Sequence, residues 1–176
     1  PMSLEVKEII LDLEHALNRI ESNVQQGGEI VQGLLKYTRK DDASIKDIEL
    51  DKLIAAALEM TQFKIKPGEM VINHEYLNSL PKIRGNFTQL QEVFFNLIDN
   101  AYDAMMQRKV ELKEPDYQPT IRISAAGGDN GHLTVVVADN GIGIQDQDKE
   151  KIFTPFFTTK LSSKKGTGLG LYVIQR

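Results

Sequence analysis

The clearest hydrophobic pattern in the chain follows Asn86 and continues to Met105. At about 100° per residue, apolar side chains fall on one face and polar side chains on the other, which predicts an amphipathic helix packed on a core. The apolar face comprises Phe87, Leu90, Phe94, Leu97, Ile98, Ala101 and Met105. The polar stripe comprises Glu92, Asn96, Asp99, Asn100 and Asp103. Asn and Asp are poor helix formers, so this stripe is either a solvated face or a ligand site, and the pattern alone leaves both open.

Shorter patterns on either side of this helix predict a mixed fold. Residues 50–63 have helical periodicity, KPGEMVINHEY predicts a turn and then a strand, and PKIRG predicts a short extended piece. TIRISAA, GGDNG and HLTVVVAD predict a β-hairpin, and either Asn86 or Thr88 is placed to cap the long helix. Together these elements predict an α+β fold, a two-layer sandwich of a mixed, mostly antiparallel sheet with helices on one face.

A different periodicity occupies the first 40 residues. Apolar residues follow a heptad spacing that predicts a long coiled-coil or helical-bundle strand within a homodimer. They are Val6, Ile10, Leu13, Leu17, Ile20, Val24, Val31 and Leu34. A turn at Gly27-Gly28, giving two shorter helices, is the alternative. The charged run RKDDAS then marks a boundary, so we expect a dimerisation helix at 1–40, a linker at 41–44 and a second domain at 45–176.

Composition narrows the class of protein. The 176 residues are 41% hydrophobic with a formal charge of −4, which argues against nucleic acid as the default partner. The chain contains no Cys, so neither a disulfide framework nor a thiolate site is possible. Its apolar runs are too short to span a bilayer, and we expect no membrane contact within this sequence.

Two glycine-rich motifs carry the candidate chemistry. In ADNGIGI, Asp139 ends a predicted strand, where its carboxylate could accept a hydrogen bond from an exocyclic amino group such as that of adenine. Gly141 and Gly143 leave room for a flat ligand, although the same residues also suit a simple turn. GTGLGL, residues 166–171, follows KIFTPFFTTK and leads into a predicted helix, an arrangement that can seat phosphate. It fits neither the P-loop nor the dinucleotide fingerprint.

Four motifs in order, EVFFNLIDNA, DNGIGI, FTPFFTTK and GTGLGL, resemble the ATP-binding domain of the two-component sensor histidine kinases. That domain belongs to a superfamily shared with type II topoisomerases, Hsp90 chaperones and MutL proteins, and its ATP-binding fold is of the Bergerat type. The resemblance covers about residues 45–176. NVQQGGEIVQGLLKYTRK looks like the second helix of the kinases' dimerisation hairpin, without the first.

The resemblance implies a nucleotide site for ATP and Mg²⁺. Asn96 would ligate Mg²⁺, and Glu92, one turn earlier, would orient water or metal or act as a base. Lys160 is implied to assist catalysis at the phosphates, beside the glycine N–H groups. The nucleotide-binding residues implied by the motifs are Asn96, Asn100, Asp103, Asp139, Gly141, Gly143, Ile144, Phe157, Thr159, Lys160, Gly166, Thr167, Gly168, Leu169 and Gly170. The segment from Pro155 to Gly166 is expected to act as a mobile lid.

The sequence also departs from the family pattern. Many of these kinases have a basic residue and Tyr at the positions of Asp103 and Ala104, so one phosphate contact is either absent or supplied by Lys160, Lys164 or Lys165. The family's phosphoacceptor motif is missing, and His15, His74 and His132 lack its context, so we expect no autophosphorylation by this chain. The sequence ends at YVIQR, and closing strands of the sheet are expected to be absent.

The resemblance thus implies the catalytic portion of a cytoplasmic sensor histidine kinase. The intact protein could be anchored in the inner membrane. It would transfer the γ-phosphoryl group of ATP to a His, and a response regulator Asp would receive it next. The alternatives are a Ser/Thr protein kinase of the anti-sigma factor type, an ATP-driven clamp, and a nucleotide-binding scaffold without catalysis.

Overall fold

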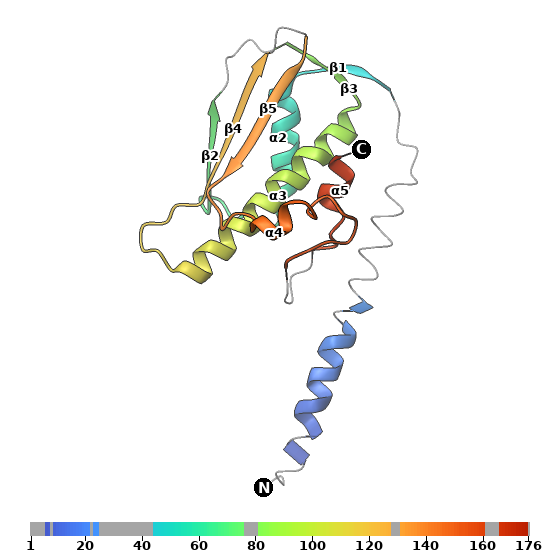
Figure 1. The fold of residues 1–176 in the computed structure, drawn as a ribbon, viewed down its shortest axis with the longest axis vertical. Coiled ribbons are helices and arrows are strands. Elements are labelled where there is room, and N and C mark those ends of the chain that lie inside the picture. The colour runs from blue at the N-terminus through green and yellow to red at the C-terminus, as the bar shows by residue number, and fades with distance from the viewer. Residues whose placement is uncertain are drawn as a thin grey trace. The chain divides into compact units, whose positions relative to one another are not determined.

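The computed structural model describes residues 6–7, 9–21, 23–24, 44–75, 81–127, 131–160 and 166–175. The chain divides into two compact units. One comprises residues 1–40 with 154–169, and the other comprises residues 41–153 with 170–176. The second unit contains every helix and strand labelled in Figure 1.

The second unit is built around a mixed three-stranded sheet. Its strands are β2 (Val71–Glu75), β4 (Thr120–Gly127) and β5 (Leu133–Asp139), in the order β2-β4-β5. β2 runs parallel to β4, with Val71 opposite Thr120, whereas β5 runs antiparallel to β4. The β4–β5 hairpin and the strand after the KPGE turn are both confirmed.

Two helices cover one face of this sheet (Figure 1). They are α2 (Leu50–Thr61) and α3 (Phe87–Leu112). Ile121 and Ile123 alternate with exposed or partly exposed residues along β4 and point into the core beneath the helices. The largest fully buried side chains come from all three elements: Leu53, Ile54, Ile98, Met105, Ile121 and Ile123. The predicted α+β sandwich with helices on one face is therefore correct.

The long helix begins where the sequence pattern places it. Asn86 is its N-cap, and its side chain accepts a hydrogen bond from the Gln89 N–H at 3.0 Å. The helix ends at Leu112, and its C-cap Lys113 has the left-handed φ of 49° that commonly closes a helix. Of the two candidate caps, Asn86 is the cap, and Thr88 lies inside the helix.

Three details of the predicted helices are corrected. Phe87, expected on the core face, is 37% exposed because it occupies the first position of α3, beyond the core cluster. Tyr102 was not expected in the core and is buried. The predicted helix at 50–63 ends at Thr61, whose carbonyl accepts the N–H groups of Lys64 and Ile65, so the chain turns and leaves Phe63 94% exposed.

Smaller elements complete the unit. β1 (Lys46–Ile48) pairs antiparallel with β3 (Ile83–Gly85), and β1 was not predicted. α4 (Asp146–Lys149) is a single turn that was also not predicted, and α5 (Gly170–Ile174) follows the second glycine motif as expected.

The first unit contains helical residues 9–21, which agrees with the predicted helix. Its heptad side chains are exposed in the single chain, with Leu13 at 56% and Leu17 at 62%. Residues 25–43, which include Gly27-Gly28, Val31, Leu34 and most of the predicted linker, lie outside the described residues, as do Lys164 and Lys165 of the predicted lid. No helix within the described ranges is long and apolar enough to cross a membrane.

Candidate functional site

The polar stripe of α3 lies at the centre of the candidate site. Asn96 and Asn100 are one turn apart and half-buried. Gly170, the first residue of α5, approaches Asn96 so closely that an ideal Cβ on it would lie 3.1 Å from the Asn96 Oδ1 atom. Glu92 is half-buried one turn before Asn96. The last glycine of GTGLG is thus brought against Asn96 within the second unit, and Asn100 is one turn further along the same helix.

The loop after β5 contacts the same helix about 12 Å further along, since Ala104 is eight residues beyond Asn96. The Ile142 N–H donates to the Ala104 carbonyl at 3.1 Å, and the Gly141 N–H donates to the Asp139 Oδ1 atom at 2.8 Å. An ideal Cβ on Gly141 would lie 2.7 Å from both Ala104 and Asp139 Oδ1. Only glycine therefore permits this approach, which fixes the Asp139 carboxylate beside α3.

A hydrogen-bond cluster around Asn140, which the sequence did not predict, holds this loop. The Asn140 side chain accepts from the Thr120 N–H at 2.9 Å and donates to the Gln118 carbonyl at 2.9 Å. The Tyr117 hydroxyl donates to Asn140 Oδ1 at 3.1 Å, and Arg108 Nη1 donates to the Asn140 carbonyl at 3.0 Å. The only sequence signal for this cluster is that Arg108 lies one helical turn beyond Ala104.

The Arg108 guanidinium has further partners in this cluster. It forms a bidentate ion pair with the Glu114 carboxylate, at 3.0 and 2.9 Å, and lies 4.9 Å from the centre of the Tyr117 ring. Burial raises the pKa of the Tyr117 hydroxyl, and the neighbouring Arg108 partly offsets that rise. Tyr117 consequently remains a neutral hydrogen-bond donor at physiological pH.

Lys64, also not predicted as a site residue, contacts the other flank of the stripe. It lies on the connection between α2 and β2, and its Nζ atom is 2.5 Å from Asp99 Oδ1 and 2.7 Å from Asp103 Oδ1. Burial lowers the pKa of Lys64, but the hydrogen bonds to Asp103 and Asp99 outweigh burial and leave that pKa above its usual value. Lys64 is therefore a cation paired with two carboxylates.

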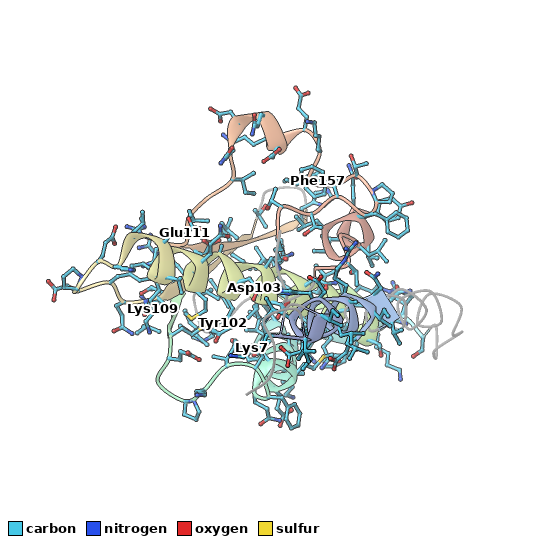
Figure 2. All side chains as sticks on the ribbon, turned by 90° about the horizontal axis from the view of Figure 1, so that it is seen from below. Lys7, Tyr102, Asp103, Lys109, Glu111 and Phe157 are labelled. Atoms are coloured by element: carbon cyan, nitrogen blue, oxygen red, sulfur yellow. The ribbon has the colours of Figure 1, made fainter. Side chains whose placement is uncertain are left out.

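Tyr102 lies beside this ion pair, and Figure 2 labels it with Asp103 on α3. Lys64 Nζ is 5.5 Å from the centre of the Tyr102 ring, and the Tyr102 hydroxyl donates to Glu69 Oε2 at 2.9 Å. Burial and the bond to Glu69 raise the pKa of Tyr102 to about 12. Backbone and side-chain hydrogen bonds from Lys66 and Tyr102 lower the pKa of Glu69.

The first unit holds the predicted site residues from Phe157 to Leu169, whereas Gly143 and Ile144 follow Gly141 in the second unit. The Phe156 N–H donates to the Gly168 carbonyl at 2.9 Å, and the Leu169 N–H donates to Thr167 Oγ1 at 3.4 Å. An ideal Cβ on Gly166 would lie 3.2 Å from Lys160 Cδ, so the Lys160 side chain lies beside the glycine motif. In this unit Phe157 is half-buried and Thr159 is exposed. Within the first unit, the structure thus brings Gly166 and Gly168 together with the segment from Phe156 to Lys160.

The donor set suits a hydrated cation more than a fully liganded one. Within the described part of the chain, no three His, Cys, Asp or Glu side chains are grouped so as to hold a metal ion. The amide oxygen of Asn96, beside Gly170, is the candidate ligand, and the Glu92 carboxylate is one helical turn before it. Mg²⁺ commonly takes one or two protein oxygens and completes its shell with water and phosphate.

Comparison with known proteins identifies the family. Residues 85–176 match the family described as histidine kinase-, DNA gyrase B-, and HSP90-like ATPase. The chain belongs to this family of ATPases. The match begins at the end of β3 and includes α3, both glycine motifs and the Asn140 cluster.

Relatives of this ATPase domain are sensor histidine kinases. The sensory histidine kinase/phosphatase NtrB of Azospirillum brasilense is 40% identical over 105 residues, which are 57% of this chain and 26% of that protein. The catalytic domain of histidine kinase ThkA superposes with a TM-score of 0.58 at 28% identity, covering 75% of this chain and 78% of ThkA's. ThkA in a complex with the response regulator TrrA superposes with a TM-score of 0.60 at 26% identity, over 84% of this chain and 41% of that one.

These comparisons confirm the resemblance to the catalytic domain of the sensor histidine kinases, which are ATP-dependent protein histidine kinases. The chain spans about a quarter of the length of the relative NtrB.

Proposed function

We propose that this chain is the Mg²⁺·ATP-binding catalytic portion of a two-component sensor histidine kinase. The intact protein transfers the ATP γ-phosphoryl group to a His, from which an Asp of a response regulator receives it. The observation that carries the proposal is the Gly141 contact. A Cβ there would collide with Ala104 and Asp139, so a carboxylate and a Cβ-free backbone face one side of the same helix that bears Asn96 and Asn100.

At the Asp139 end, the residues suit an adenine ring. A carboxylate accepts several hydrogen bonds, so Asp139 can accept one from the exocyclic amino group while it holds the Gly141 N–H. Guanine presents a carbonyl at the corresponding place, which a carboxylate repels. Gly143, with φ of 80°, and the exposed Ile144 continue the loop on this side and are proposed to border the base.

At the Asn96 end, the residues suit phosphate and Mg²⁺. Asn96 is proposed to ligate the ion, Glu92 to orient it or a water molecule, and Asn100 to lie beside the phosphates. Lys160 and the glycine motif, with Thr167 and Leu169, are proposed to contact the terminal phosphates. ATP supplies the transferable group, and these residues contribute position and charge neutralisation, which provide most of the catalysis of phosphoryl transfer.

A calorimetric titration with a non-hydrolysable ATP analogue tests the nucleotide site. Binding is expected to strengthen with Mg²⁺ and to be much weaker for the guanosine analogue. It should be lost in Asp139→Asn, because one side-chain oxygen is still needed by the Gly141 N–H and the other is replaced by an NH₂ group, a donor where the adenine amino group needs an acceptor. Circular dichroism of both proteins establishes that the variant is folded. Equal binding of the adenosine and guanosine analogues would contradict the proposed role of Asp139.

Two partner proposals accompany this function. The exposed apolar residues of the first helix, such as Leu13 and Leu17, are proposed to form a homodimer contact. Multi-angle light scattering should give a dimer mass, and Leu13→Asp with Leu17→Asp should give a monomer mass. The second partner is a response regulator receiver domain.

The chain itself is proposed to lack the phosphoacceptor. Incubation with [γ-³²P]ATP should leave its three histidines unlabelled. Acid-labile, base-stable label on His15, His74 or His132 would show that an acceptor is present after all.

A further inference from the structure

The polar stripe of α3 presents a charge problem for a site that binds polyphosphate. Asp99 and Asp103 are one turn apart on the helix, and Asn100 lies between them in the sequence. Like charges at this spacing repel each other, and they also repel an anionic ligand brought to the neighbouring asparagines. Among the proposed phosphate-binding positions, Asp103 is therefore the least suited by charge.

Lys64, on the connection between α2 and β2, neutralises part of this negative charge. Its single ammonium group contacts both carboxylates, at 2.5 Å to Asp99 and 2.7 Å to Asp103. The carboxylates are about one-quarter exposed, with side-chain values of 28% and 25%, so water screens their field only in part. With Lys64 in place the three side chains carry one net negative charge, and without it they carry two.

We propose that Lys64 is a nucleotide-positioning residue, which neutralises the Asp99 and Asp103 carboxylates and so allows polyphosphate to approach Asn96 and Asn100. This inference rests on the proposed ATP site and assigns a role to a residue outside all four nucleotide motifs. Lys64 acts through the two carboxylates and does not itself need to touch the phosphates.

A purely architectural role accounts poorly for the arrangement. The Lys64 side chain is 42% exposed, and ion pairs of this exposure contribute little to stability. The turn that carries Lys64 is fixed independently, because the N–H groups of Lys64 and Ile65 bond to the Thr61 carbonyl. The ion pair is therefore better placed to tune charge than to hold the connection.

The charge of the ligand distinguishes the two roles. An electrostatic effect grows with ligand charge, so it is absent for adenosine, present for AMP and larger for ADP. Dissociation constants of these three ligands are measured by calorimetry without Mg²⁺ for the unmodified chain and for Lys64→Met. We expect Lys64→Met to weaken ADP about tenfold and to leave adenosine within about twofold.

Three further variants sharpen the test. Lys66→Met removes the same charge from the same connection, but Lys66 acts on Glu69, and ADP binding should stay within about twofold. Lys64→Arg should retain ADP binding. Asp103→Asn introduced into Lys64→Met removes one repelling charge and should recover ADP affinity to within about threefold of the unmodified chain.

The outcomes separate this inference from the proposed function. If the unmodified chain binds ADP and Lys64→Met binds it equally well, the inference is wrong and the ATP site stands. An equal loss of adenosine and ADP would mean that Lys64 maintains the shape of the site, which also overturns the inference. If the unmodified chain is folded and binds none of the three ligands, the proposed function fails and the inference fails with it.

Discussion

The loop at residues 140–144 and the connection at residues 62–70 both contact α3, but different kinds of bond hold them there. The loop is held by directed hydrogen bonds, from Ile142 to the Ala104 carbonyl and from Asn140 to the main chain at Thr120 and Gln118. The connection is held mainly by charge, through Lys64 and its two carboxylates, with one hydrogen bond from the Tyr102 hydroxyl to Glu69 beside them. Directional hydrogen bonds between mostly uncharged groups fix the position of the loop. An ion pair mainly sets the local electrostatic potential.

This difference matches the proposed nucleotide site, in which the base lies at the Asp139 end and the phosphates lie at the Asn96 end. A base is recognised by the geometry of its edge, so small displacements matter, and the Asn140 cluster limits them. Phosphates are recognised largely by charge, so the balance between Lys64, Asp99 and Asp103 matters more than the position of any one atom. Substitutions at the loop should therefore alter shape and stability, and substitutions at Lys64 should alter affinity for charged ligands.

The largest expected effect comes from filling the space at Gly141. Gly141→Ala would place a Cβ 2.7 Å from Ala104 and Asp139 Oδ1, which real contacts do not allow, so the loop must move away from α3. We expect the affinity for an ATP analogue to fall at least about a hundredfold, measured by calorimetry. Gly127→Ala at the end of β4 is the matched control, because its Cβ would meet nothing within 4 Å. Unchanged binding in Gly141→Ala would mean that the loop contact does not shape the site.

The next effect concerns the stability of the loop. Asn140→Ala removes the acceptor of the partly buried Thr120 N–H, which is left unpaired. It also removes a donor to the exposed Gln118 carbonyl, which keeps its hydrogen bond from the Thr120 hydroxyl. The free energy of unfolding should fall by about 2–3 kcal/mol in urea titrations. Gln147→Ala removes an exposed amide that bonds only two residues away, and it should change stability by less than about 0.5 kcal/mol. Similar losses in the two variants would show that Asn140 does not brace the loop.

A smaller effect on stability is expected at high pH, where Tyr102 ionises. Burial and Glu69 favour the neutral phenol and raise the pKa of Tyr102 from 10.0 to about 12 in the folded chain. Stabilisation is therefore complete below pH 10 and is lost as pH rises toward 12, by about 1–2 kcal/mol. Unfolding free energies at intervals from pH 9 to 12 should show this decline, and Tyr102→Phe should reduce its slope. An identical slope in the variant would exclude Tyr102 as the source.

The smallest effect on stability should come from Lys64. Because its ion pairs are partly exposed, Lys64→Met should change the free energy of unfolding by less than about 1 kcal/mol, even though we expect it to weaken ADP about tenfold. Thermal melting followed by circular dichroism measures the change in stability. A loss above about 2 kcal/mol would place Lys64 with the Asn140 cluster as a structural element and remove the contrast between the two regions.

Sequence patterns predicted the elements whose signals are local. The alternation in TIRISAA and HLTVVVAD, the Asn86 cap and the spacing on α3 each lie within one short segment, and the structure confirms all three. The glycine motifs were likewise found from neighbouring residues, and the family match includes them.

The contacts that the sequence did not predict join distant segments. Lys64 and Asp99 are 35 residues apart, and Tyr117 and Asn140 are 23 apart, so no local period relates them. β1 is only three residues long, and its pairing with β3 depends on a partner far along the chain. Side-chain charge alone could not indicate which of the many Lys residues would contact the polar stripe of α3.

The parallel pairing of β2 with β4 has a consequence for how this unit folds. These strands flank α3 in the sequence, so Val71 can meet Thr120 only after the intervening chain, with α3 in it, has crossed from one strand to the other. The β4–β5 hairpin closes a far shorter stretch and needs no such crossing. Because non-local pairing slows folding, the rate at which this unit forms depends on the same helix that bears the two asparagines. Substitutions on the buried face of α3 will therefore change the folding rate as well as the site.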